Sequence, residues 1–140
     1  MKPWEIALIE YDTLEVVGLN NNPKILEYSK EIGALWVKDD ETPWCAIFMQ
    51  WCLKKAGLPF SYHANARYFL NYGEHTVTPK LGDIVILWRG SIASSMGHVA
   101  FFVKENLDTV WLLGGNQNNK VTILPYSKKQ VLEYRKILDK

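Results

Sequence analysis

The chain has 140 residues, of which 48% are hydrophobic and 22% are charged, and its formal net charge is +1. A chain of this size and composition can bury a sizeable core, so we expect residues 1–140 to form a single domain and not a disordered polymer. The nearly balanced charge and the lack of a basic run argue against a nucleic-acid partner, and no apolar run is long enough to span a membrane.

Helical spacing of apolar residues dominates the first half of the chain. It predicts four helices, over residues 3–12, 23–32, 44–56 and 64–72. In the first of these, Ile6, Leu8 and Ile9 are expected to pack inward. At the second, Asn22 and Pro23 have the residue types of an N-cap and a first helical residue.

The second half of the chain has the pattern of a sheet. Short apolar runs separated by glycine, proline and polar residues predict five strands, over residues 82–88, 98–103, 110–116, 121–124 and 131–134. Because the helices come first and the strands follow, we expect an α+β domain and not a parallel α/β sheet.

Cys45 is the most informative residue of the first half. It lies at the predicted start of the third helix, two residues after Pro43, whose missing N–H costs nothing there. Backbone N–H groups at a helix start lack intrahelical partners, and the helix dipole is positive at that end. Both favour the thiolate, which is the nucleophilic form of cysteine. A cysteine in an apolar helix is also commonly a small buried side chain, so this position alone leaves both interpretations open.

The second cysteine, Cys52, lies nearly two turns further along the same helix. At 1.5 Å per residue the two Cα atoms are about 10 Å apart. A disulfide requires less than about 7 Å, so the two cysteines cannot be bridged while the helix exists. Cys52 also lies far from the positive end of the helix, among Trp51 and Leu53. We therefore expect Cys52 to pack in the core and Cys45 to carry the chemistry.

His98 opens the predicted strand 98–103, beside a polar loop from which a side chain can reach a cleft. If strands 98–103 and 110–116 form an antiparallel hairpin, His98 at the start of one lies beside Asn116 at the end of the other. An amide bonded to one ring nitrogen would orient the imidazole so that the other nitrogen faces a nucleophile. Gln117 is the alternative to Asn116 for this role.

These segments resemble a known family. The runs PWCA, GDIVILWRG, GHVAFFV and LLGGNQN are similar to those of the papain-like cell-wall cysteine peptidases of the CHAP and NlpC type. They are most similar to a small, often phage-encoded subfamily with Trp-Cys and Gly-Gly-Asn-Gln signatures. The resemblance covers roughly residues 22–135. It implies a papain-like fold, in which an antiparallel sheet of about five strands packs against the helix that carries the nucleophile.

The resemblance also implies a site and a substrate. By position it assigns the nucleophile to Cys45, the base to His98 and the polar third residue to Asn116, with Gln117 as the rival. The implied reaction is hydrolysis of an amide bond in peptidoglycan, without a cofactor. Backbone N–H groups at the helix start, beside Trp44, are candidates for an oxyanion hole. The Trp44 ring is either a cleft wall or part of the core.

No metal site is predicted. His63, His75 and His98 are isolated in the sequence, and no pair with metal-ligand spacing occurs. The acidic triplet 39–41 precedes the helix of Cys45, and some members of the similar family bind calcium nearby. The alternating oxygen spacing of a calcium loop is missing here, so stabilisation of the helix dipole is the simpler interpretation.

The combined prediction is a monomeric peptidoglycan hydrolase, either an endopeptidase or an amidase. Two alternatives stay open: a non-catalytic wall-binding or virion-structural module on the same fold, and a Cys–His toxin that acts on a protein substrate. Glu5 and Glu10 interrupt the first apolar residues and no cleavage site follows, so no signal peptide is predicted. We expect synthesis in the cytoplasm and action on the cell wall after release or delivery, with a delivery partner or an immunity protein as further partners to consider.

Overall fold

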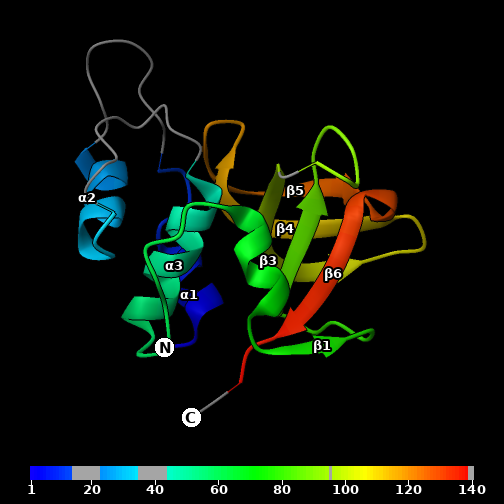
Figure 1. The fold of residues 1–140 in the computed structure, drawn as a ribbon, viewed down its shortest axis with the longest axis horizontal. Helices are drawn as coiled ribbons and strands as arrows, with labels where there is room; N and C mark the ends of the chain where they lie inside the picture. Colours follow the sequence, from blue (N-terminus) through cyan, green and yellow to red (C-terminus); the bar gives the residue numbers. More distant parts are fainter. Residues whose placement is uncertain (14–22, 35–43, 95, 139–140) are drawn as a thin grey trace.

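The computed structural model describes residues 1–13, 23–34, 44–94 and 96–138. Helices come first and a six-stranded antiparallel sheet follows, with strand order β1-β6-β2-β3-β4-β5 (Figure 1), which confirms the α+β prediction. The helices are α1 (Pro3–Ile9), α2 (Pro23–Glu31), α3 (Cys45–Lys55) and the 3₁₀ helices η1 (Ala66–Asn71) and η2 (Lys128–Gln130). The strands are β1 (Glu74–Thr76), β2 (Ile84–Trp88), β3 (Gly97–Glu105), β4 (Thr109–Gln117), β5 (Lys120–Ser127) and β6 (Val131–Lys136).

Strand β1 and helix η1 were not predicted in this form from the sequence. The five predicted strands are present, and the sixth is β1, a three-residue strand that pairs with β6 in the register Glu74↔Lys136. The helix predicted over residues 64–72 is the shorter 3₁₀ helix η1, which begins after Asn65, whose side chain accepts a hydrogen bond from the backbone N of Arg67 at 2.8 Å. The predicted N-cap Asn22 lies outside the described residues.

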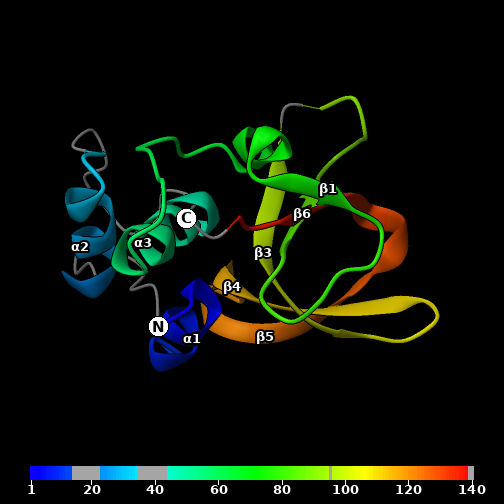
Figure 2. The same ribbon diagram turned by 90° about the horizontal axis from the view of Figure 1, so that it is seen from below.

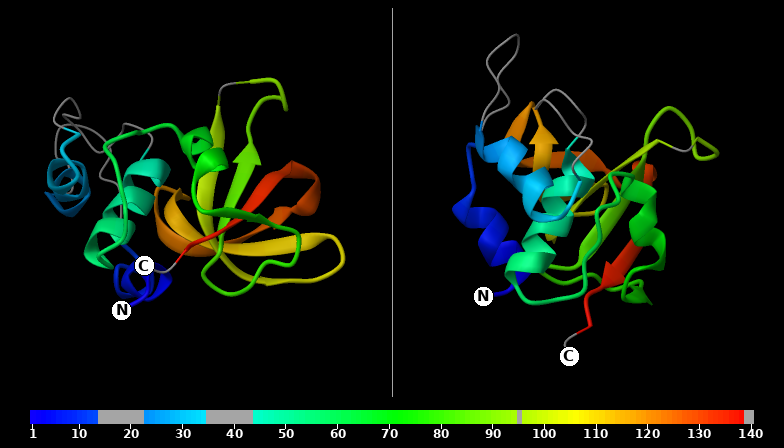
Figure 3. Two further views of the ribbon diagram at one scale, coloured as in Figure 1. Left: turned by 60° about the horizontal axis from the view of Figure 1, so that its bottom comes forward. Right: turned by 60° about the vertical axis from the view of Figure 1, so that its left-hand side comes forward.

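Helix α3 is the central element of the helical layer. It contacts β3 and β4 of the sheet, and both α1 and α2 pack against it. Helix α2 lies on the side away from the sheet, so α3 lies between α2 and the sheet (Figures 1 and 3). All residues from Cys45 to Leu53 are buried; eight of these nine are apolar, and the polar one, Gln50, is hydrogen-bonded to Ser61. No helix within the described residues is long and apolar enough to cross a bilayer.

The sheet buries apolar side chains on both faces. One face packs against the helices through side chains that include Ile86, Val99 and Leu113. The other face carries a second apolar cluster, formed by Val85, Leu87, Ala100, Phe102, Val110 and Leu112. Tyr126 of β5 and Tyr134 of β6 both pack on this second cluster although three strands separate β5 from β6 in the sheet. The sheet is therefore strongly curved, which brings its ends toward each other (Figure 2).

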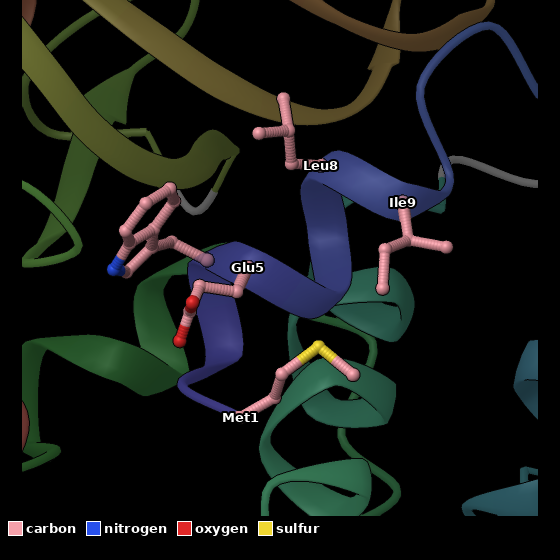
Figure 4. Close-up of a pocket in the computed structure, with 5 residues that line it drawn as sticks. Met1, Glu5, Leu8 and Ile9 are labelled. Atoms are coloured by element: carbon pink, nitrogen blue, oxygen red, sulfur yellow. The ribbon is translucent and has the colours of Figure 1, made fainter.

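Helix α1 differs from the prediction in its packing. Ile6 is buried as expected, but Leu8 and Ile9 are exposed, so the prediction that they pack inward was wrong. The buried side of this seven-residue helix is formed by Pro3, Ile6 and Ala7. At about 100° per residue, Leu8 points roughly 150° and Ile9 roughly 110° away from the direction midway between Ile6 and Ala7, so both lie outside the buried side. They line a shallow apolar hollow together with Met1, Trp4 and Glu5 (Figure 4).

A glycine in β4 lets α3 approach the sheet closely. A Cβ atom on Gly115 would lie 2.7 Å from Cζ3 of Trp44 and 2.9 Å from Cβ of Phe48. Neither Gly114 nor Gly115 has a positive φ, so the pair serves close packing and not a tight turn. The Trp44 ring fills this space, is 1% exposed and belongs to the core, not to a cleft wall.

We predict that Gly115→Ala destabilises the fold by about 1–3 kcal/mol, the usual cost of overpacking a core. The added methyl group would press on the Trp44 ring and push the start of α3 away from β4. Urea denaturation followed by tryptophan fluorescence measures this change. An unchanged midpoint in the variant would show that α3 does not depend on this close contact.

Candidate active site

Cys45 is the first residue of α3 and is 5% exposed. The N-cap residue Trp44 provides no side-chain cap, and the first helical hydrogen bond runs from N of Phe48 to O of Trp44 at 2.9 Å. Backbone N–H groups in the first turn of a helix have no intrahelical acceptor. The sulfur therefore lies where backbone donors and the positive end of the helix dipole are available.

The surroundings of Cys45 favour its thiolate. Burial raises the pKa of the Cys45 thiol, but the charge of a protonated His98, a hydrogen bond to its side chain, a backbone hydrogen bond from Val99 and the charge of Arg89 together lower that pKa below its ordinary value. For Cys52, in contrast, burial and the charge of Glu10 raise the pKa well above its ordinary value. The lowered pKa makes Cys45 the candidate reactive thiol, and Cys52 is packed in the core, where the sequence analysis expected it.

His98 is completely buried at the start of β3, and Gln117 holds its ring. Nε2 of His98 lies 2.9 Å from Oε1 of Gln117. The amide nitrogen of Gln117 donates to O of Leu112 at 3.0 Å and to O of Thr122 at 2.8 Å, which uses both of its protons. Because Oε1 can only accept a hydrogen bond, Nε2 of His98 must be the donor and therefore carries a proton. Nδ1 is then the nitrogen that carries a lone pair toward Cys45.

The structure gives this hydrogen bond to Gln117 and not to Asn116, for which it was predicted. In a regular strand, Asn116 would follow Gly114 on the face that carries Ala100 and His98. A bulge interrupts the β4–β5 register between Gly114 and Gln117, and Asn116 has a φ of 57°. The extra residue shifts the alternation by one position, so Gln117 takes the inward place and is 1% exposed. Within the described residues, both ring nitrogens of His98 have partners other than Asn116.

Cys45 is one of the residues that line an open hollow of about 390 Å³. Its lining residues are Cys45, Ala64, Asn65, Ala66, Arg89, Met96 and Gly97. This volume is in the range of small-molecule and peptide sites. The hollow on α1 (Figure 4) has neither a cysteine nor a histidine in its lining, so the first hollow is the candidate active site.

Arg67 joins two segments that line this hollow. Its guanidinium donates to the carbonyl oxygens of Met96 at 2.8 Å, Ile92 at 2.8 Å and Ser91 at 3.1 Å. A Cβ atom on Gly97 would lie 3.3 Å from Cγ of Arg67, so the glycine leaves room for this side chain. Arg67 therefore ties η1 to the loop between β2 and β3.

Arg89 is a site residue that the sequence reasoning missed. It directly follows β2, and its Nη2 lies 3.3 Å from Nδ1 of His98. The β2–β3 hairpin pairs Leu87 with His98 and Trp88 with Gly97, so the end of β2 meets the start of β3. An antiparallel pairing of the predicted strands 82–88 and 98–103 would have placed Arg89 next to His98, on the side opposite β4.

No group of three potential metal-ligating side chains occurs in the described residues. The acidic triplet 39–41 and Pro43 lie outside the described part of the chain.

Trp88 donates from Nε1 to O of Lys129, and Trp111 packs under Nζ of Lys104. Neither tryptophan lines the hollow at Cys45.

The family of this fold and site is shown by a comparison with protein-family models. The CHAP domain model matches residues 37–116, which is more than half of the chain. The protein therefore belongs to the CHAP domain family of the papain-like amidase and peptidase superfamily, whose members are mostly cysteine-dependent hydrolases. The match contains Cys45 and His98 and ends one residue before Gln117. A search of curated proteins found no match.

We predict that Gln117→Ala slows alkylation of Cys45 at neutral pH by roughly threefold to tenfold, the range for loss of one hydrogen bond that positions the imidazole. Asn116→Gly should keep the parent rate, because glycine tolerates the positive φ at this position. Peptide mapping after iodoacetamide treatment, at matched folded concentration, measures both rates. A larger loss in Asn116→Gly than in Gln117→Ala would return the positioning role to Asn116.

The lowered pKa of Cys45 predicts an alkylation profile displaced to acid pH. Since the thiolate is the reacting form, Cys45 should still react at pH values where a free cysteine is mostly protonated. His98→Ala should move the acid limb of the alkylation profile to higher pH, because the substitution removes the hydrogen bond and the charge beside the sulfur. Cys52, with its raised pKa, is the internal control that stays unreactive. Identical limbs in the parent and in His98→Ala would show that His98 does not act on the thiol.

Proposed function

We propose that this protein is a peptidoglycan hydrolase that cleaves an amide bond of the stem peptide, or the bond that joins the stem to the glycan. The observation that carries the proposal is the hydrogen-bonded Cys45–His98 pair at the base of an open hollow, in a chain of the CHAP family. CHAP domains act on peptidoglycan, and this pair has the parts that thiol-dependent amide cleavage needs.

In the first step, the sulfur of Cys45 attacks the carbonyl carbon of the bound amide while its proton passes to Nδ1 of His98. The carbonyl oxygen becomes an oxyanion, and the backbone N–H groups at the start of α3 are placed to donate to it. The C–N bond then breaks, Nδ1 gives its proton to the leaving amine, and a thioester remains on Cys45.

In the second step, water hydrolyses the thioester. Nδ1 of His98 accepts a proton from the attacking water, a second tetrahedral oxyanion forms and collapses, and the proton returns to the leaving sulfur. Gln117 is a positioning residue in both steps, because its bond to Nε2 keeps Nδ1 directed at the sulfur.

The open shape of the hollow supports a polymeric substrate. Its walls come from η1 and the segment before it on one side and from the β2–β3 loop on the other. A chain can therefore enter and leave without being threaded into a closed cavity. Because peptidoglycan lies outside the cytoplasm, this function includes a route to the cell wall, by lysis of a host cell or by delivery.

We predict that Cys45→Ala abolishes release of soluble fragments from purified peptidoglycan, because the nucleophile is lost. Cys52→Ala is the matched control, and it should keep fragment release while losing stability through a small cavity in the core. Mass spectrometry of the released fragments measures activity and identifies the bond that is cut.

Equal release by Cys45→Ala and the parent protein would end the thiol mechanism. Absence of any release by a folded parent protein that alkylates rapidly at Cys45 would instead favour a reactive thiol with another substrate.

A further inference from the structure

Arg89 has an unusual position among the arginines of this chain. The guanidinium of Arg67 donates hydrogen bonds to three backbone carbonyl groups. That of Arg135 donates to O of Tyr72 and O of Gly73 and forms an ion pair with Glu133. The hydrogen-bond contact of Arg89 is with Nδ1 of His98, and within the described residues no carboxylate forms an ion pair with it. A guanidinium has five N–H donors, and most of them are not used by the described residues.

Arg89 contributes a positive charge to the hollow at Cys45. Arg89 is the one charged residue among the lining residues in the described part of the chain. Tyr126, which approaches the imidazole from β5 with a centroid separation of 5.6 Å, does not balance the charge. Burial raises the pKa of the Tyr126 phenol to about 12, so it is neutral at neutral pH.

The contact between Arg89 and His98 restricts the state of the imidazole. An arginine can only donate, so Nη2 can approach Nδ1 at 3.3 Å only while Nδ1 is unprotonated. Proton transfer from Cys45 to Nδ1 would place two donors and two positive charges against each other. Arg89 must then move away from Nδ1, and its charge needs a new partner.

We propose that Arg89 is an anion subsite, which binds a carboxylate of the substrate close to the amide bond that is cut. A carboxylate is the acceptor that matches a guanidinium in geometry, with two parallel hydrogen bonds. Binding it holds Arg89 away from Nδ1, and this favours the form of the pair in which Nδ1 carries the proton of Cys45. The anionic substrate thereby stabilises the Cys45–His98 pair that is already present in the free protein. This inference rests on the proposed function for the nature of the substrate, but not for the presence of the subsite.

The subsite is tested without peptidoglycan by two alkylating agents that differ in charge. Iodoacetate carries a carboxylate and iodoacetamide does not, so their rate ratio at Cys45 reports attraction of an anion to the hollow. Arg89→Gln should lower the ratio of iodoacetate to iodoacetamide by about tenfold, the effect of one charge-assisted hydrogen bond. Arg89→Lys keeps a point charge without the planar donors and should give an intermediate ratio.

Lys80→Gln is the matched control, since Lys80 is exposed before the opposite end of β2 and the substitution removes the same charge. It should keep the parent ratio. An unchanged ratio in Arg89→Gln and Arg89→Lys, with both variants folded by circular dichroism, would overturn the subsite.

A second arm tests the substrate. Peptidoglycan whose free carboxylates have been converted to amides with carbodiimide and ammonia should be cut about tenfold more slowly than untreated peptidoglycan by the parent protein. Arg89→Gln should cut both at the same reduced rate. Equal rates of the parent on both substrates would overturn the carboxylate assignment. If the parent cuts neither, the proposed function has failed, and the alkylation ratios still decide whether the subsite exists.

Discussion

The hydrogen bond between Nε2 of His98 and Oε1 of Gln117 is the interaction on which the site depends. It determines which nitrogen of the imidazole is protonated and which one faces Cys45. The bond is itself fixed, because the two carbonyl groups of Leu112 and Thr122 hold the amide nitrogen and leave only the oxygen for the ring. All of these groups are buried, where an unsatisfied polar atom is costly, so one arrangement is strongly preferred.

Two features of β4 bring this arrangement to the nucleophile. Gly115 gives the Trp44 ring room to lie against the strand, which sets the start of α3 beside β3. The bulge at Asn116 then moves the next side chain to the inward face. The β3–β4 pair closest to the start of β3 is Phe101↔Leu113. Two residues before Phe101 in the chain, the backbone of Val99 forms a hydrogen bond to Cys45.

The sequence allowed much of this to be predicted. Cys45 at a helix start, His98 at a strand start and an amide at the end of the next strand follow from periodicity, helix-end chemistry and the hairpin rule. The choice between Asn116 and Gln117 did not follow, because strict alternation favours Asn116 and only the bulge reverses it. Strand β1 has no apolar alternation and exists by pairing with β6, far away in the sequence. Arg89 was within reach of the hairpin rule but was considered only as part of a loop.

The orientation of His98 is tested most directly by its ring nitrogens. Long-range ¹H–¹⁵N NMR correlation at neutral pH distinguishes a protonated ring nitrogen from one with a lone pair, and variants of His63 and His75 assign the signals. The account predicts that Nε2 of His98 is protonated in the free protein, with Nδ1 directed at Cys45. A proton on Nδ1 together with a bare Nε2 would contradict it, because His98 could then neither donate to Gln117 nor accept the proton of the thiol.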